Sequence, residues 1–236
     1  MLQPRAYPEL IGKALVLEAE PFMVMVDDDD PWVEGIFLTI SLGFLVGVAR
    51  LIGGVLTAAT LPPPDAILAT LLQGWRQYSL YLPQQVNPAI GEAALRESWA
   101  MAAYWGGYSG GWLRLLTVIT TPASFLLQWL VAGALVYAVA RLLGGTGALN
   151  PTLGATALMV APNVLRLFEA IPFVAVSQLL LTVWGVLVLY RAVEVAHELP
   201  WSRALLAALA PWILLALLAF VISLLVGAGI VMWSQT

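Results

Sequence analysis

Long uncharged stretches, each bracketed by single charged residues, dominate the second half of the chain. Between Arg114 and Arg141 lie 26 uncharged residues, between Arg141 and Arg166 lie 24, and between Glu169 and Arg191 lie 21. The last 33 residues carry no charge. Because a helix needs about 20 apolar residues to cross a bilayer core about 30 Å thick, each stretch predicts one crossing. The fold class we expect is all-α, a polytopic integral membrane bundle.

About five transmembrane helices are predicted, one before a long insert and four after it. The expected spans are Trp32–Ala59, Leu115–Ala140, Thr152–Leu167, Ile171–Tyr190 and Ala204–Trp233. Pro162 is expected to kink the third span, because proline lacks the N–H group of the helix ladder. An odd number of spans places the termini on opposite sides. Lys and Arg divide almost evenly between the two sides, and we expect a cytoplasmic N-terminus because the tail Met232–Thr236 has no positive charge.

An acidic head, residues 1–31, precedes the first span, residues 32–60. Apolar positions at helical spacing over Glu9–Val26, interrupted by Pro21, predict a short amphipathic helix on the membrane surface. Asp27–Asp30 directly precede Pro31, an order that suits the start of a helix. Calcium loops alternate their ligands around a glycine turn, so we interpret the four aspartates as a helix cap.

The insert, residues 61–113, differs in composition from the four-helix part, residues 114–236. It holds four of the ten Trp and four of the seven Tyr, residue types that favour the membrane–water interface. Helices are expected over Ala66–Tyr81 and Gly91–Tyr104. We interpret the insert as helices that lie in the interface, with a re-entrant hairpin over residues 98–113 as the alternative.

Composition excludes several kinds of chemistry. Of the 236 residues, 61% are hydrophobic and only 10% charged, against about 25% charged in soluble domains. Cysteine is absent and His197 is the single histidine, which excludes disulfides, iron–sulfur clusters and a bis-histidine haem within the chain. Residues 1–34 carry a net charge of −6 and the rest of the chain carries +2, which gives a total of −4. Such a head disfavours nucleic acid and anionic lipid as its ligands.

A series of motifs in the second half recurs in one known family. A Gly-Gly turn leads into a small-residue segment that ends near a proline, and a Trp-bearing span then leads into a short loop with a histidine. The residues are Gly144–Gly147, Ala161–Asn163, Trp184, Arg191–His197 and Ser202–Ala204, with Glu20–Phe22 and the acidic cluster before Trp32 as the lead-in. Over residues 15–60 and 115–230 this pattern resembles the bacterial branch of the Yip domain family (Ypt-interacting proteins).

The resemblance implies a five-span helical domain in a bacterial cytoplasmic membrane, with a cytoplasmic N-terminus. Eukaryotic members bind small GTPases and shape transport membranes, whereas bacterial members mostly lack an assigned activity. The insert departs from the compact family pattern.

Arg50 is the one basic residue within the first expected span, and three interpretations stay open. It could snorkel to the interface beside Gly53 and Gly54, pair with a structural partner, or serve transport. An arginine near the bilayer centre costs about 2.5–3.5 kcal/mol on insertion scales, so some compensation is needed.

Further charges lie at the ends of the later spans. Arg166 and Glu169, and likewise Arg191 and Glu194, are three residues apart and can pair on one helical face. Glu194 and His197 have the Glu-x-x-His spacing of di-iron bundles, but those sites need a second such motif and two more glutamates. We therefore predict no metal and no cofactor, and we place His197 at the polar interface between the last two spans.

Aromatic residues spaced along the insert form a candidate docking surface for another membrane protein. Its residues are Trp99, Tyr104, Trp105, Tyr108 and Trp112. Aromatic side chains anchor buried interfaces, and the interleaved glycines would let helices approach closely. The alternative interpretation is an interfacial aromatic belt.

Catalytic groups cannot be assembled from this sequence, which contains no Ser/His/Asp set and no pair of carboxylates within a span. We therefore expect a non-catalytic accessory or scaffold subunit of a larger membrane complex. Its partners would be the lipid bilayer and other integral membrane subunits, and a photosynthetic or respiratory energy-transducing complex is one candidate assembly. A free-standing Yip-type membrane-organising or trafficking protein and a small transporter are the alternatives.

Overall fold

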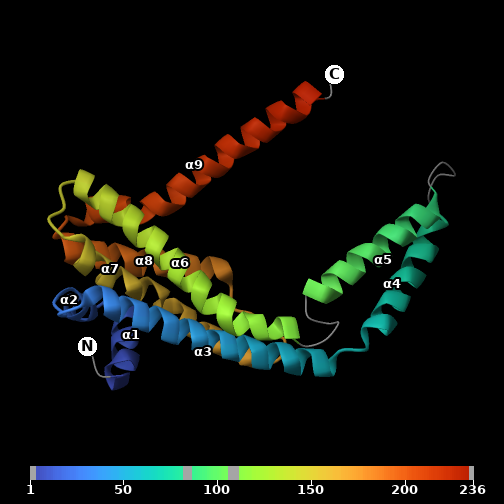
Figure 1. Cartoon of the computed structure of the whole chain (residues 1–236), viewed down its shortest axis with the longest axis horizontal. Coiled ribbons are helices and arrows are strands. Elements are labelled where there is room, and N and C mark those ends of the chain that lie inside the picture. Colours follow the sequence, from blue (N-terminus) through green and yellow to red (C-terminus); the bar gives the residue numbers. More distant parts are fainter. Residues whose placement is uncertain (1–3, 82–86, 106–111, 234–236) are drawn as a thin grey trace. The chain divides into compact units, whose positions relative to one another are not determined.

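The computed structural model describes residues 4–81, 87–105 and 112–233, which form helices joined by turns and contain no strand (Figure 1). The prediction of an all-α membrane bundle is confirmed. In chain order the elements are the 3-10 helix η1 (Pro4–Ala6), α1 (Tyr7–Leu15), α2 (Glu20–Val26), α3 (Pro31–Thr60), α4 (Pro64–Ser79), α5 (Pro88–Trp105), α6 (Trp112–Leu142), α7 (Leu149–Ala157), the 3-10 helix η2 (Leu158–Ala170), α8 (Gln178–His197) and α9 (Trp201–Trp233).

Within the described residues, four helices are long and apolar enough to cross a membrane. They are Pro31–Thr60, Arg114–Leu142, Gln178–His197 and Trp201–Leu224. Four of the five expected spans therefore correspond to single long helices.

The remaining expected span, Thr152–Leu167, has a different structure. The nine-residue helix α7 continues as the thirteen-residue 3-10 helix η2. Pro162 lies inside η2 and has no N–H to give to an α-helical bond. A 3-10 helix rises about 2.0 Å per residue, so the segment still covers a long distance. Residues 152–162 are all buried, so this segment runs through the core of the bundle.

The span expected at Ile171–Tyr190 starts later and ends later than predicted. Pro172 and the left-handed Phe173, with φ of +64°, precede α8, and the Ser177 side chain caps it by accepting from the Leu180 N–H at 3.4 Å. The helix then extends to His197 and ends at Glu198, which also has a positive φ.

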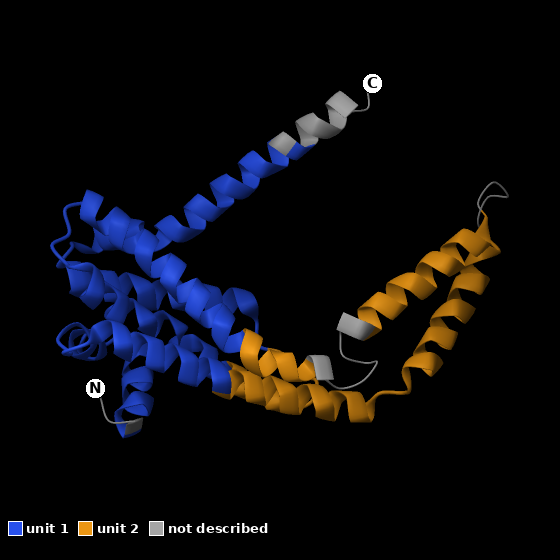
Figure 2. Ribbon diagram, viewed as in Figure 1, with its two compact units in different colours: residues 1–44, 121–165, 176–236 blue, residues 45–120, 166–175 orange. Residues whose placement is uncertain are grey.

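Two compact units divide the described chain (Figure 2). Unit 1 comprises residues 1–44, 121–165 and 176–236, and unit 2 comprises residues 45–120 and 166–175. The boundary falls within the helices α3 and α6.

The core of unit 1 forms around α7 and α8. Helix α7 contacts α2 and α8, while α8 also contacts α1, α2 and α9. Fully buried side chains from several elements fill the space between them, and the largest are Trp129, Phe22, Met25, Leu158 and Leu189.

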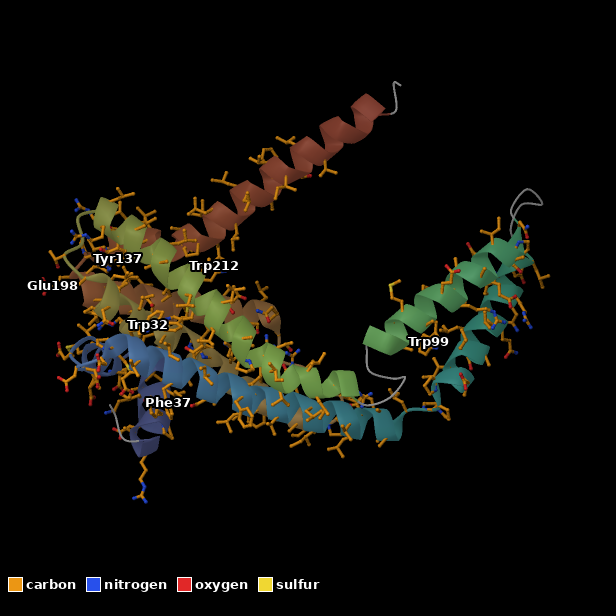
Figure 3. The ribbon with its side chains drawn as sticks, in the orientation of Figure 1. Trp32, Phe37, Trp99, Tyr137, Glu198 and Trp212 are labelled. Atoms are coloured by element: carbon orange, nitrogen blue, oxygen red, sulfur yellow. The ribbon has the colours of Figure 1, made fainter. Side chains whose placement is uncertain are left out.

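The acidic head is two helices packed against this core, not one helix. Leu17, with φ of +62°, breaks the chain between α1 and α2, and Pro21 lies in the first turn of α2. Trp184 of α8 donates its indole N–H to the carbonyl of Leu15 at 2.9 Å. Phe37, labelled in Figure 3, stacks on Tyr7 with ring centroids 5.2 Å apart.

A helical hairpin of α4 and α5 makes up much of unit 2. Trp75 of α4 donates to the carbonyl of Pro88 at 3.1 Å, and its ring lies where a side chain on Gly91 would stand. Glu92 of α5 pairs with Arg76 at 3.2 Å and with Arg96 at 2.8 Å. Hydrogen bonds from Arg96 and Arg76 hold the pKa of Glu92 below its usual value.

Close helix approach in unit 1 depends on a glycine. A Cβ atom on Gly43 of α3 would lie 2.5 Å from the Cα atom of Pro122 in α6. Small residues let membrane helices approach closely, where dispersion and weak polar contacts replace the hydrophobic effect.

We predict that Gly43→Ala lowers the free energy of unfolding by about 1–3 kcal/mol, the usual cost of forcing atoms into a packed site. Thermal unfolding in mild detergent measures this change. Gly54→Ala is the matched control in the same helix, because a Cβ there has nothing within 4 Å. The control should be neutral or slightly stabilising, since glycine is a poor helix former. Equal unfolding temperatures for Gly43→Ala and the wild type would contradict the prediction.

Candidate functional site

Polar side chains gather at two places in the described chain. We call the first the His197 junction, made of His197, Thr152 and the turn Gly144–Gly147 in unit 1. The second, the Arg50 cluster, consists of Arg50, Arg114, Arg166 and Glu169 in unit 2. Each has polar groups at the ends of apolar helices.

His197 is only 1% exposed, and its ring contacts the hydroxyl of Thr152. The Thr152 hydroxyl donates its single proton to the Ala148 carbonyl at 2.6 Å. His197 Nε2 lies 2.9 Å from the same hydroxyl oxygen, a hydrogen bond in which Nε2 donates when it carries the ring proton. The opposite nitrogen, Nδ1, has no hydrogen-bond partner among the described residues.

The glycine turn is shaped around this histidine. A Cβ on Gly145 would lie 2.7 Å from His197 Nδ1, and one on Gly147 would lie 2.3 Å from the Ala196 carbonyl. Gly144 has φ of +94°, a conformation that favours glycine. The Thr146 amide also donates to the His197 carbonyl at 3.3 Å. The Gly-Gly-Thr-Gly motif therefore serves close packing between the end of α6 and the end of α8.

Helix α9 is tied to the same junction. Arg203, near its start, donates to the Leu143 carbonyl at 3.1 Å, and Arg141 donates to the Gly145 and Thr146 carbonyls, each at 3.2 Å. Tyr137, labelled in Figure 3, has its ring centroid 6.0 Å from that of His197.

A buried acid that the sequence analysis did not single out lies near the start of α3. Glu34 is 1% exposed and accepts a hydrogen bond from the Tyr7 hydroxyl. Burial, followed by this hydrogen bond and the nearby charge, raises the pKa of Tyr7 well above its usual value. Glu34 is the only acid in the sequence of α3, and this isolation could have identified it as a candidate buried residue. Its partner lies 27 residues away, so the sequence alone could not supply it.

The Arg50 cluster joins three segments of unit 2. Arg50 Nε lies 3.0 Å from one carboxylate oxygen of Glu169, and Arg166 lies 4.0 Å from the other. Arg114, at the start of α6, donates to the Gly54 carbonyl at 2.8 Å. A Cβ on Gly53 would lie only 1.8 Å from the Glu169 carbonyl oxygen. Gly53 therefore lets α3 approach the segment of Glu169 closely, and the backbone carbonyl of Gly54 links α3 to α6.

The other charged candidates lie within helix α8. Arg191 pairs with Glu194 three residues later, and Arg191, Glu194 and His197 all belong to the last two turns of α8. Among the described residues, no three His, Cys, Asp or Glu side chains come close enough to hold a metal ion.

The five candidate docking residues are only partly described. Trp99 lies on α5 and is half-buried (Figure 3). Tyr104 and Trp105 form the end of α5, and Trp112 begins α6, while their side chains and all of Tyr108 lie outside the described residues. Their role as a docking surface stays a prediction.

Together, the long apolar helices and the polar contacts at their ends define a multi-pass helical membrane protein. The Yip1 domain model matches residues 15–223, most of the chain, and the chain therefore belongs to the Yip1 domain family. The resemblance to the Yip domain family is confirmed, and the match begins within the head and runs past the α4–α5 hairpin. No curated protein and no solved structure matches the chain significantly.

The Tyr7–Glu34 contact predicts a loss of stability at alkaline pH. Because the pKa of Tyr7 is raised in the folded state, the folded chain keeps a proton that the unfolded chain releases above about pH 10. Stability should therefore be fully present below about pH 10 and fall as the pH rises beyond it. Thermal unfolding followed from about pH 8 to about pH 11 should show a shallower fall for Tyr7→Phe than for the wild type. Tyr78→Phe, at an exposed tyrosine of α4, should keep the wild-type slope; an unchanged slope in Tyr7→Phe would refute this account.

Proposed function

We propose that this Yip-family protein is a non-catalytic accessory or scaffold subunit of a larger assembly in a bacterial cytoplasmic membrane, with its N-terminus in the cytoplasm. The observation that carries the proposal is the α4–α5 hairpin, whose two helices pack mainly on each other. An energy-transducing complex is one assembly in which such a subunit could serve.

The hairpin has internal contacts that fix its shape and an outer surface that is apolar. Ion pairs around Glu92 and the packing of Trp75 on Gly91 hold its two helices together. Only Leu72 and Ala103 are buried among its described apolar side chains. Large apolar side chains stay exposed on it, namely Leu71, Tyr78, Leu80, Tyr81, Ile90 and Met101.

Such a surface needs a partner or a bilayer to cover it. In proteins, most helical stability comes from the packing of an apolar face. Exposed apolar patches mark contacts with proteins or membranes, and aromatic residues and methionine are enriched in protein interfaces. The aromatic content of the hairpin favours a protein partner that lies at the membrane surface.

Helix α9 offers a second uncovered surface. Every residue from 213 to 224 is exposed, whichever face of the helix it lies on. A helix that is apolar all round belongs within a membrane, where lipid or another subunit's helix covers it.

The polar chemistry of the described chain is consistent with a structural role. His197, Thr152 and Glu34 are engaged in contacts between helices. A catalytic site would need titratable groups that face a cavity accessible to substrate.

Native gel electrophoresis of gently solubilised source membranes, followed by mass spectrometry of the band that contains the chain, tests the proposal. We expect co-migration with a stoichiometric set of other membrane subunits. Met101→Glu, on the exposed face of α5, should release the chain from that band because a charge there opposes burial in an interface. Val16→Glu, an equally drastic change at an exposed position of the head, should leave the band intact.

Migration of the wild type alone would refute the subunit proposal. It would favour the alternative of a free-standing Yip-type membrane-organising or trafficking protein. Loss of co-migration in Val16→Glu as well as in Met101→Glu would refute the hairpin as the docking surface.

A further inference from the structure

We propose that the Arg50 cluster binds the phosphate of an anionic phospholipid headgroup. The cluster borders a pocket of about 240 Å³ in unit 2. Arg50, Gly53, Gly54 and Thr57 of α3 form one side, and Glu169 with the segment 171–175 forms the other.

The cluster beside this pocket is rich in arginine. The cluster contains three arginines and the single carboxylate of Glu169, a net charge of +2. Arg166 and Glu169 are largely buried, with side chains 11% and 13% exposed. Positive charge within or beside a membrane is costly. An anion that enters the pocket would lower this cost.

The guanidinium of Arg50 has donors available for that anion. Its Nε lies 3.0 Å from Glu169, and the side chain is 42% exposed. The two terminal amino groups of Arg50 make no hydrogen bond to any described residue. A guanidinium can bind phosphate through two parallel N–H···O bonds, and Arg50 presents this pair of donors at the pocket.

The position of Arg50 along α3 suits a headgroup. Arg50 lies 19 residues after Pro31, the first residue of α3, which is a rise of about 28 Å at 1.5 Å per residue. The hydrocarbon core of a bilayer is about 30 Å thick. A helix that enters the membrane at the acidic cluster would therefore bring Arg50 to the opposite headgroup layer.

An apolar rim beside the pocket favours a lipid over a free phosphate ion. Ile171, Phe173 and Val174 line the pocket and are exposed. Phe173 has φ of +64°, an unfavourable conformation for a bulky residue, and such strain concentrates at ligand sites. The rim offers a surface for the first acyl carbons of a lipid whose phosphate contacts Arg50.

Lipid binding by the purified full-length chain tests the proposal. Short-chain phosphatidylglycerol is titrated onto the protein in mild detergent, and native mass spectrometry measures the bound fraction. Arg50→Gln should bind about 10-fold more weakly, which corresponds to about 1.4 kcal/mol. Arg76→Gln is the matched control, because Arg76 is also exposed and paired with a glutamate in unit 2, and it should bind as the wild type does.

Glu169→Gln distinguishes phosphate binding from a purely structural ion pair. This change removes the competing carboxylate, so it should preserve or strengthen lipid binding while Arg50→Gln weakens it. If Arg50→Gln does not fold, Arg50→Lys replaces it and should bind a few-fold more weakly, because an ammonium cannot form the paired bonds.

Three results would overturn the proposal. The first is wild-type lipid affinity in both Arg50 variants, and the second is an equal loss of affinity in Glu169→Gln and Arg50→Gln. The third is equal binding of inorganic phosphate and phosphatidylglycerol to the wild type, which would assign the site to the free ion.

Discussion

The hydrogen bond between His197 and Thr152 is the contact on which most of unit 1 depends. It lies where the end of α8 meets the start of α7, and the turn after α6 closes over it through Gly145 and Thr146. In a membrane no hydrophobic force drives helix against helix, so small residues and polar contacts determine which helices associate. The buried polar groups of this chain are used at helix ends, where they set the relative position of apolar segments.

Much of the architecture could be predicted from the spacing of charges. Single charged residues beside long uncharged stretches mark both ends of α6 and the start of α9 to within a few residues, because a charge inside the bilayer core is costly. The pairing of Arg191 with Glu194 likewise follows from helical spacing alone. Family motifs such as the Gly-Gly turn indicated the same fold, and the structure supplies their physical reason in the packing of glycine on His197.

Contacts between distant segments could not be predicted. Thr152 is 45 residues from His197 and Glu169 is 119 residues from Arg50, and no periodic pattern connects such pairs. The 3-10 helix η2 was also not predicted. Hydropathy shows that a segment is apolar, but it does not show whether the backbone hydrogen bonds join residues three or four positions apart. The packing of the head on α8 could not be predicted either, because an amphipathic stretch can cover a membrane surface or a protein core equally well.

A double-mutant cycle on His197 and Thr152 tests most directly whether buried polar contacts hold the bundle together. Thr152→Val, His197→Leu and the double variant are unfolded reversibly in detergent, and their free energies of unfolding are compared with the wild type. The account predicts a coupling of about 0.5–3 kcal/mol, the range for residues in direct contact. Effects that add to within about 0.3 kcal/mol would show that the two residues do not stabilise each other, and would contradict the account.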